Sequence, residues 1–216
     1  MLKQRKNRVI ELFGLPGAGK STLAKYIESN HGSEYCVVSV NRIERFFYFS
    51  IFCIVYPFFV IHILRWVRAS PKKVRRYIAH LFSVSAAKTL KSLLYIYFSN
   101  KNFIIDEGVF QRILSVSQTV LSREDAIRHV SKIPKWLRKV LVVEGENFSR
   151  YTSSSTQSPR STLGDEYLNN WIGIQKENYI LIRDIIKNLP YLEVVSFDNT
   201  EKRDLNRSDL LGVLKR

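Results

Sequence analysis

The feature that most constrains this chain is a glycine-rich stretch near its N-terminus, residues 14–21, which reads GLPGAGKS. It fits the pattern G-x-x-x-x-G-K-[ST], in which glycines let successive backbone N–H groups point inward at phosphate oxygens. The apolar segment from Arg8 to Phe13 has the composition of a β-strand, and apolar residues from Thr22 to Ile27 recur at helical spacing. A strand before the loop and a helix after it are the context in which this pattern binds phosphate, so the stretch predicts a nucleotide-binding loop.

Two side chains of the loop indicate which chemistry it serves. We expect the ammonium group of Lys20 to bridge the β- and γ-phosphates of a nucleoside triphosphate, and the hydroxyl of Ser21 to hold Mg²⁺. ATP and Mg²⁺ are therefore the expected cofactors. The residues assigned to nucleotide binding are Gly14, Leu15, Pro16, Gly17, Ala18, Gly19, Lys20, Ser21 and Thr22.

Strand-like and helical segments alternate along the chain. The strand-like segments are short and almost continuously apolar, as strands covered on both faces are. Strands that alternate with helices predict an α/β fold with a parallel sheet and right-handed crossovers. A chain of 216 residues is most simply one domain, residues 1–216. The expected strands are Arg8–Phe13, Tyr35–Val40, Asn102–Asp106, Lys139–Val143 and Leu192–Phe197.

The charge of the chain is strongly positive and unevenly distributed. The formal net charge is +15, and no acidic residue occurs between Glu44 and Asp106. Such a surface attracts an anionic substrate, an anionic membrane or nucleic acid, in that order of preference, although a solvated basic face without a partner remains an alternative.

The only cysteines, Cys36 and Cys53, do not form a disulfide framework, and the N-terminus does not resemble a secretory signal. We therefore expect a cytoplasmic protein.

Residues 46–64, FFYFSIFCIVYPFFVIHIL, contain no Asp, Glu, Lys or Arg and are long enough to span a membrane. A single crossing would separate the loop at residues 14–21 from the strand that ends at Asp106, although both belong to one sheet, so we reject a full span. Two interpretations remain: a buried helix pair kinked near Pro57, which we favour, or an amphipathic pair that lies peripherally on an anionic inner membrane face through residues 46–98. The aromatic side chains could also line an acceptor pocket.

Two carboxylates end the third expected strand, at Asp106 and Glu107. Because the carboxyl ends of parallel strands face the ligand, these side chains are expected beside Mg²⁺ and the γ-phosphate. One carboxylate can serve the metal while the other accepts the proton of an acceptor hydroxyl. We assign Asp106 to the metal or to the role of base, with Glu107 as the competing base; the alternative is an acidic turn without a catalytic role.

With these parts in order, the sequence resembles the P-loop small-molecule kinases, which include nucleoside monophosphate, thymidylate, deoxynucleoside, shikimate and gluconate kinases. Only the loop at residues 14–21 is highly specific for this resemblance. It implies a three-layer P-loop NTPase fold, with helices on both faces of a five-stranded parallel sheet of order 2-3-1-4-5. It also implies an acceptor-binding helical region at residues 41–101 and a lid loop at residues 144–163.

The same resemblance implies roles for four arginines. Arg42 and Arg112 would hold the acceptor, and Arg150 and Arg160 would close over ATP as catalytic residues that stabilise the transferring phosphoryl group. The lid lacks the close-set arginine pair that is typical of nucleotide kinases, and the acceptor region is more aromatic and more basic than theirs. The acceptor is therefore not restricted to a nucleotide.

Three functions fit these features. The first is an ATP-dependent kinase that transfers the γ-phosphoryl group to a small-molecule acceptor, either nucleotide-like or another anionic or hydroxyl compound. The second is a P-loop ATPase that associates with a membrane or a protein partner and phosphorylates no small molecule. The third is a polynucleotide 5′-kinase or nucleic-acid-binding ATPase. The aromatic residues cluster in one apolar run instead of alternating with Lys and Arg, which counts against nucleic acid.

Overall fold

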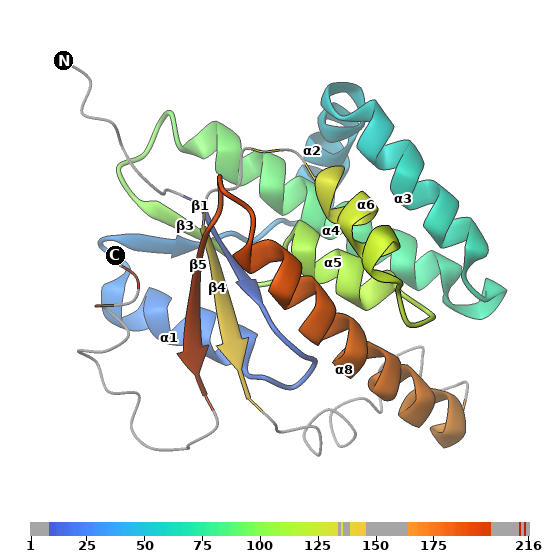
Figure 1. The fold of residues 1–216 in the computed structure, drawn as a ribbon. Helices are drawn as coiled ribbons and strands as arrows, with labels where there is room; N and C mark the ends of the chain where they lie inside the picture. Colours follow the sequence, from blue (N-terminus) through green and yellow to red (C-terminus); the bar gives the residue numbers. More distant parts are fainter. Residues whose placement is uncertain are drawn as a thin grey trace.

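The computed structural model describes residues 9–133, 135, 139–145, 164–199, 212 and 214. Its centre is a five-stranded sheet in which every neighbouring pair is parallel, and the strand order is β2-β3-β1-β4-β5 (Figure 1). The predicted α/β class and strand order are thereby confirmed. The strands are β1 (Val9–Phe13), β2 (Tyr35–Val37), β3 (Asn102–Ile105), β4 (Lys139–Glu144) and β5 (Glu193–Asp198).

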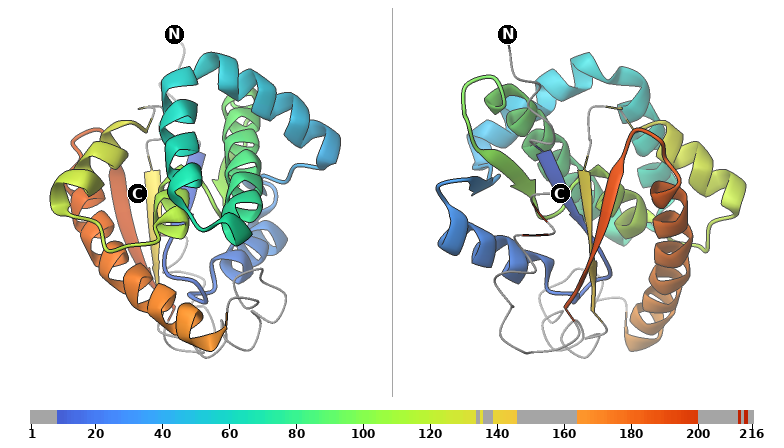
Figure 2. Two further views of the ribbon diagram at one scale, coloured as in Figure 1. Left: turned by 90° about the vertical axis from the view of Figure 1, so that its right-hand side faces the viewer. Right: turned by 60° about the vertical axis from the view of Figure 1, so that its left-hand side comes forward.

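Helices cover both faces of the sheet, as expected. Helix α1 packs on one face, and α4, α5 and α8 cover the other (Figure 1 and Figure 2). Side chains of β1 alternate between the two layers: Ile10 and Leu12 join the cluster of α1, whereas Val9 and Phe13 join the larger cluster on the opposite face. The helices are α1 (Lys20–His31), α2 (Arg42–Val55), α3 (Pro57–Ala69), α4 (Lys72–Tyr95), α5 (Val109–Val116), α6 (Arg123–Ser131) and α8 (Asp165–Lys187).

Strand β2 is shorter than the sequence predicts, because it ends at Val37 and not at Val40. The N–H of Val38 still donates to the carbonyl of Ile104 at 2.9 Å, and after it the chain leaves the sheet for α2. Strands β3 and β4 differ from the expected bounds by one residue at one end and β5 by one residue at each end, which is the usual uncertainty of such boundaries. Strand β1 starts at the first described residue, Val9.

Helices α2 and α3 form a bent pair that packs on α4. Asn41 and Glu44 form a capping box that begins α2, and Pro57 begins α3 after a bend of 110°. The prediction of a kink near Pro57 is confirmed, but the prediction of a buried pair is wrong. Each helix buries only the face toward the core, so Phe52 is the single fully buried residue of α2. The opposite face is solvent-exposed because no described element covers it.

None of the described helices is by itself long and apolar enough to cross a membrane. Counted together, the bent pair α2–α3 has the length and the apolar composition of a broken span. Phe52, Phe59 and Ile63 lie in the same hydrophobic cluster as β-strand residues such as Phe13. One side of the pair is therefore part of the protein core.

Candidate functional site

The glycine-rich loop joins β1 to α1 at the carboxyl edge of the sheet. Gly17 and Gly19 have φ angles of 84° and 83°, a region that residues with a Cβ rarely adopt. Gly14 lies so close to β4 that an added Cβ would meet the carbonyl oxygen of Val143 at 2.5 Å. The glycines are thus needed for the turn and for close packing, as the sequence predicts for a tight turn, while phosphate binding by the loop stays a prediction.

Lys20 begins α1 and folds back over the loop. Its Nζ donates hydrogen bonds to the carbonyl oxygens of Gly14 and Leu15, each at 2.9 Å. The side chain is buried, and this burial lowers the pKa of Lys20 to about 8, although the negative charges of Glu107 and Asp106 oppose the shift. An anion in the loop would offer this ammonium group a stronger partner than two carbonyls, so the site favours phosphate.

Asn199, which directly follows β5, holds the loop in place at the carboxyl edge of the sheet. Its backbone N–H donates to the carbonyl of Glu144 at 2.7 Å, and its side-chain Nδ2 donates to the carbonyl of Ala18 at 2.8 Å. An added Cβ on Gly19 would collide with this amide. The sequence gives no sign of this anchor, because residues 18 and 199 are brought together only by the fold.

We expect Asn199→Ala to weaken nucleotide binding by about fivefold while the protein stays folded. Loss of the amide leaves the carbonyl of Ala18 without its donor, and one such hydrogen bond is worth about 1 kcal/mol. Isothermal titration with ATP would measure the change. Asn188→Ala is the matched control, since Asn188 also donates to a backbone carbonyl, that of Asp184, but on the exposed end of α8. Equal affinities for all three proteins would contradict the anchor.

Glu11 is a second residue that the sequence does not reveal. It lies in the middle of β1, is fully buried, and its Oε1 accepts the N–H of Gln111 at 2.9 Å in the first turn of α5. Burial raises the pKa of Glu11 to about 8, against the opposing effect of the α5 backbone N–H groups. Gly108 is required beside it, because a Cβ there would collide with the carboxyl group. Glu11 therefore connects β1 to the helix that carries Gln111 and Arg112.

The raised pKa of Glu11 predicts a stability that depends on pH. The folded protein retains a proton that the unfolded chain releases above pH 4.5, so the stabilisation is complete below about pH 4.5 and is lost as pH rises through about 8. The free energy of unfolding should therefore fall by about 2 kcal/mol or more between pH 5 and pH 8, and the melting temperature should fall with it. We expect Glu11→Gln to flatten this decline. Glu177→Gln, on the exposed side of α8, is the control that should leave the decline unchanged.

The two carboxylates after β3 have different partners. Asp106 pairs with Lys88 of α4, with an Nζ to Oδ1 distance of 2.6 Å. Glu107 pairs with Arg112, whose Nη2 lies 2.5 Å from Oε2, and Arg112 also donates from Nε to the hydroxyl of Ser85 at 2.8 Å. Arg112 is almost completely buried, so its guanidinium is held in a fixed position.

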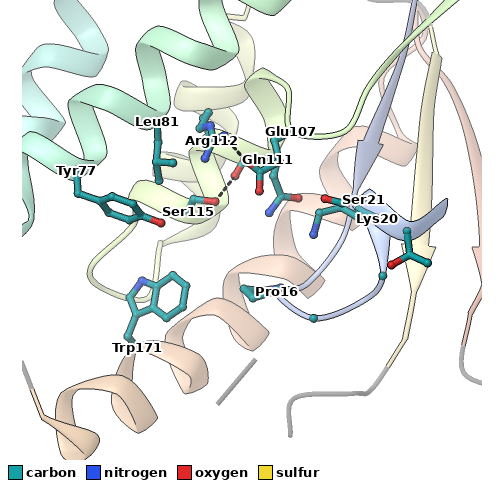
Figure 3. Close-up of a pocket in the computed structure, with 13 residues that line it drawn as sticks. Pro16, Lys20, Ser21, Tyr77, Leu81, Glu107, Gln111, Arg112, Ser115 and Trp171 are labelled. Atoms are coloured by element: carbon teal, nitrogen blue, oxygen red, sulfur yellow. Dashed lines mark hydrogen bonds and ion pairs between the residues drawn. The ribbon is translucent and has the colours of Figure 1, made fainter. Parts of the chain in front are cut away.

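A cavity of about 430 Å³ brings the loop and these residues together. In Figure 3, Lys20 and Ser21 lie at one end and Tyr77 and Trp171 at the other, with Glu107 and its neighbours between them. One end of the cavity thus offers hydrogen-bond donors to a phosphate group, the middle offers a carboxylate and a guanidinium, and the far end offers an aromatic surface. The lining residues are Pro16, Gly17, Gly19, Lys20, Ser21, Thr22, Tyr77, Leu81, Glu107, Gln111, Arg112, Ser115 and Trp171.

Sequence reasoning did not single out five of the lining residues: Tyr77, Leu81, Gln111, Ser115 and Trp171. Gln111 accepts the N–H of Gly14 through its Oε1 at 3.1 Å and thereby joins α5 to the loop. Tyr77 and Trp171 come from α4 and α8, which are far apart in sequence. Their helical spacing gives the same pattern as ordinary core residues, so only the fold distinguishes them.

The remaining predicted site residues lie elsewhere. Asp106 is not among the cavity-lining residues, because its side chain turns toward Lys88. Arg42, at the start of α2, lines a separate hollow with Phe46 and Phe49. The aromatic residues of α2 and α3 do not line the cavity beside the loop. Arg150, Arg160 and all but the first two residues of the predicted lid at residues 144–163 lie outside the described residues.

The donor set at the phosphate end of the cavity fits Mg²⁺. Ser21 supplies a hydroxyl and the carboxylate of Glu107 lines the same cavity, whereas Asp106 pairs with Lys88 outside it. Mg²⁺ prefers oxygen ligands and is usually bound by one or two carboxylates together with phosphate oxygens and water, so a protein cage is not required. Within the described residues no group of three or more His, Cys, Asp or Glu side chains forms such a cage.

No protein-family model and no curated protein matches the sequence. Solved structures do match. Deoxyadenosine kinase from M. mycoides with bound dATP superposes with a TM-score of 0.50 at 14% identity, over 96% of this chain and 100% of that chain. The same enzyme with dCMP and a flexible dCDP gives 0.50 at 15% identity, over 96% and 97%. Thymidylate kinase from Ehrlichia chaffeensis gives 0.49 at 12% identity, over 97% and 99%.

The chain has the fold of the P-loop nucleoside kinases. The likeness extends over almost the whole chain, so the nucleoside kinase fold accounts for the sheet, the loop and the helical region between β2 and β3. At this level of identity the likeness concerns the fold and assigns no acceptor. The chemistry of the site must therefore be argued from its own side chains.

Proposed function

We propose that this protein is an ATP- and Mg²⁺-dependent kinase that transfers the γ-phosphoryl group to a hydroxyl or phosphate of a small-molecule acceptor. The observation that carries this proposal is the composition of one cavity, in which Lys20 and Ser21 of the phosphate loop face Glu107 and Arg112. A triphosphate at the loop and an acceptor against the α5 side would meet between these groups. The solved structures of this fold with bound dATP support nucleotide use.

The acceptor end of the cavity favours a molecule with both a ring or apolar part and a polar part. Tyr77, Leu81 and Trp171 offer a flat apolar surface, while Gln111 and Ser115 offer hydrogen-bonding groups. A nucleotide-like compound fits these features, and so does another hydroxyl compound with an apolar ring.

Each charged residue then has a part in transfer. Lys20 would exchange the carbonyls of Gly14 and Leu15 for β- and γ-phosphate oxygens, and the loop N–H groups would hold the triphosphate in line with the acceptor. Glu107 would accept the proton of the acceptor hydroxyl, and Arg112 would orient this carboxylate and the acceptor.

Ser21, with Glu107 or Asp106, would hold Mg²⁺, which would supply positive charge against the developing charge of the phosphates. Arg150 and Arg160 are proposed, from sequence, to close over ATP and to stabilise the charge on the transferring group.

The test is to incubate the protein with Mg²⁺, ATP labelled at the γ-phosphate, and a panel of nucleosides, nucleotides, sugars and aromatic alcohols. We expect label to move to at least one acceptor. Including a 5′-hydroxyl oligonucleotide in the panel tests the polynucleotide kinase alternative directly. Label that appears only in inorganic phosphate, whatever the acceptor, would contradict the kinase.

One observation favours a second function. The exposed apolar faces of α2 and α3 fit a P-loop ATPase that works at a membrane or on a protein partner without phosphorylating a small molecule. Such a protein would release labelled inorganic phosphate, and it would do so faster in the presence of its partner.

A further inference from the structure

The outward face of the α2–α3 pair carries large apolar side chains that the described part of the protein leaves exposed. Phe46 and Ile54 of α2 are 76% and 79% exposed, and Phe58 of α3 is 84% exposed. The bend between the helices places Ile54 and Phe58 on either side of the elbow. We use the term elbow surface for six exposed apolar residues of this pair: Phe46, Phe47, Ile54, Phe58, Ile61 and Leu64.

Single exposed apolar residues are common on soluble proteins, but six of them on consecutive helices are not. The inner faces of the same helices bury Phe52, Phe59 and Ile63 in the core, so the pair is fixed on the protein. The exposed residues of its outer face are therefore not core residues that are wrongly turned outward. A surface of this kind marks a site of contact with another apolar phase or partner.

Positive charge adjoins the elbow surface. Phe58, Ile61, Arg65 and Arg68 are spaced three or four residues apart, so the two exposed arginines continue the apolar stripe of α3. Lys72 and other exposed basic residues follow at the start of α4. Among the described residues, no carboxylate forms an ion pair with these side chains. Their charge is therefore available to an anionic partner.

We infer that the elbow surface binds an anionic lipid bilayer, with α2 and α3 lying on the membrane and not crossing it. Aromatic side chains such as Phe46 and Phe58 enter the boundary between headgroups and acyl chains, and Arg65 and Arg68 contact headgroup phosphates. This combination of apolar and cationic side chains on one helical pair is the pattern of an interfacial anchor. The inference is independent of the proposed phosphotransfer, since the elbow surface shares no residue with the cavity beside the loop.

Charge also decides between a membrane and a second copy of the chain. Residues 45–105 contain basic but no acidic residues. A symmetric dimer through the elbow surface would bring two such cationic regions together without opposing carboxylates, which is unfavourable. A bilayer that contains phosphatidylglycerol supplies the missing negative charge.

The experiment is flotation of the whole protein, without nucleotide, with vesicles of phosphatidylcholine alone or with about 30% phosphatidylglycerol. We expect binding to the anionic vesicles that is at least about tenfold tighter than binding to the neutral ones, and that weakens as salt is raised to about 0.5 M. Equal binding to both vesicles, or no binding to either, would overturn the inference.

Two double variants separate the contributions. Phe46→Gln with Phe58→Gln should reduce vesicle binding by about tenfold or more, because two inserted rings are lost. Arg65→Gln with Arg68→Gln should reduce binding to anionic vesicles by about tenfold or more and leave the weak binding to neutral vesicles unchanged. Ile180→Gln is the matched control, since Ile180 is 59% exposed on α8 and should bind as the unchanged protein does.

Sedimentation velocity without vesicles distinguishes the alternative occupant. A dimer that dissociates in the Phe46→Gln, Phe58→Gln variant would assign the elbow surface to a second copy and would overturn the lipid assignment. Retained ATP binding in each variant would show that the variants are folded. Because vesicle binding and phosphotransfer are measured separately, the failure of one leaves the other testable.

Discussion

Lys20→Ala is expected to reduce phosphotransfer by about a thousandfold, since it removes the one ammonium group of the loop that can contact the β- and γ-phosphates. The fold should survive, because within the described part of the chain the ammonium group of Lys20 donates only to the loop carbonyls of Gly14 and Leu15. Lys25→Ala, on the exposed side of the same helix, is the matched control and should retain full activity. Rates with labelled ATP and circular dichroism spectra would measure activity and folding.

The same lysine predicts how ATP affinity depends on pH. In the free protein burial lowers the pKa of Lys20 to about 8, whereas bound phosphate favours the charged form. Binding above pH 8 therefore requires uptake of a proton, and the dissociation constant for ATP should rise by about tenfold per pH unit there. Titration calorimetry in buffers of different ionisation heat would detect the proton. An affinity that is constant from pH 7 to pH 9.5 would contradict the role of Lys20, and so would full activity of Lys20→Ala.

Glu107→Gln should slow transfer to the acceptor by about a hundredfold or more, the scale expected for a positioned general base. Its carboxylate lines the cavity and is oriented by Arg112 at 2.5 Å, whereas Gln can accept no proton. ATP affinity should change by less than about threefold, because the loop provides most of the contacts to the triphosphate.

Asp106→Asn separates the two carboxylates. Asp106 is bonded to Lys88 outside the cavity, so we expect a smaller loss of rate than for Glu107→Gln and a rise in the Mg²⁺ concentration needed. Steady-state rates of both variants over a range of Mg²⁺ concentrations would rank them. A larger loss of rate for Asp106→Asn would return the role of base to Asp106 and leave Glu107 as the partner of Arg112.

The sequence was sufficient for the parts of this protein that are governed by local rules. The spacing of the glycines predicts a tight turn between β1 and α1, and the positive φ angles of Gly17 and Gly19 confirm this turn, which consecutive residues build. Phosphate binding there stays a prediction. Almost continuous apolar strands that alternate with helices predict a parallel sheet, and Pro57 predicts the break between α2 and α3 because it cannot continue a helix.

The parts that the sequence did not reveal depend on contacts between distant residues. Glu11 reads as an interruption in an apolar strand, and only the packing of α5 against β1 gives its carboxyl group a hydrogen-bond donor. The choice between Asp106 and Glu107 depends on the directions of two adjacent side chains, which Lys88 and Arg112 set.

The apolar segment at residues 46–64 shows the same division most clearly. Its composition determined that it would be helical, kinked and in need of apolar surroundings, because burying the apolar surface of an uncharged run of this length away from water is strongly favourable. Composition does not state which face of each helix meets the core. The packing of α2 and α3 on α4 decided that: it buried Phe52 and Phe59 and left Phe46 and Phe58 exposed. The physical reason is that a helix packed against a single neighbour can bury only the face that points toward this neighbour.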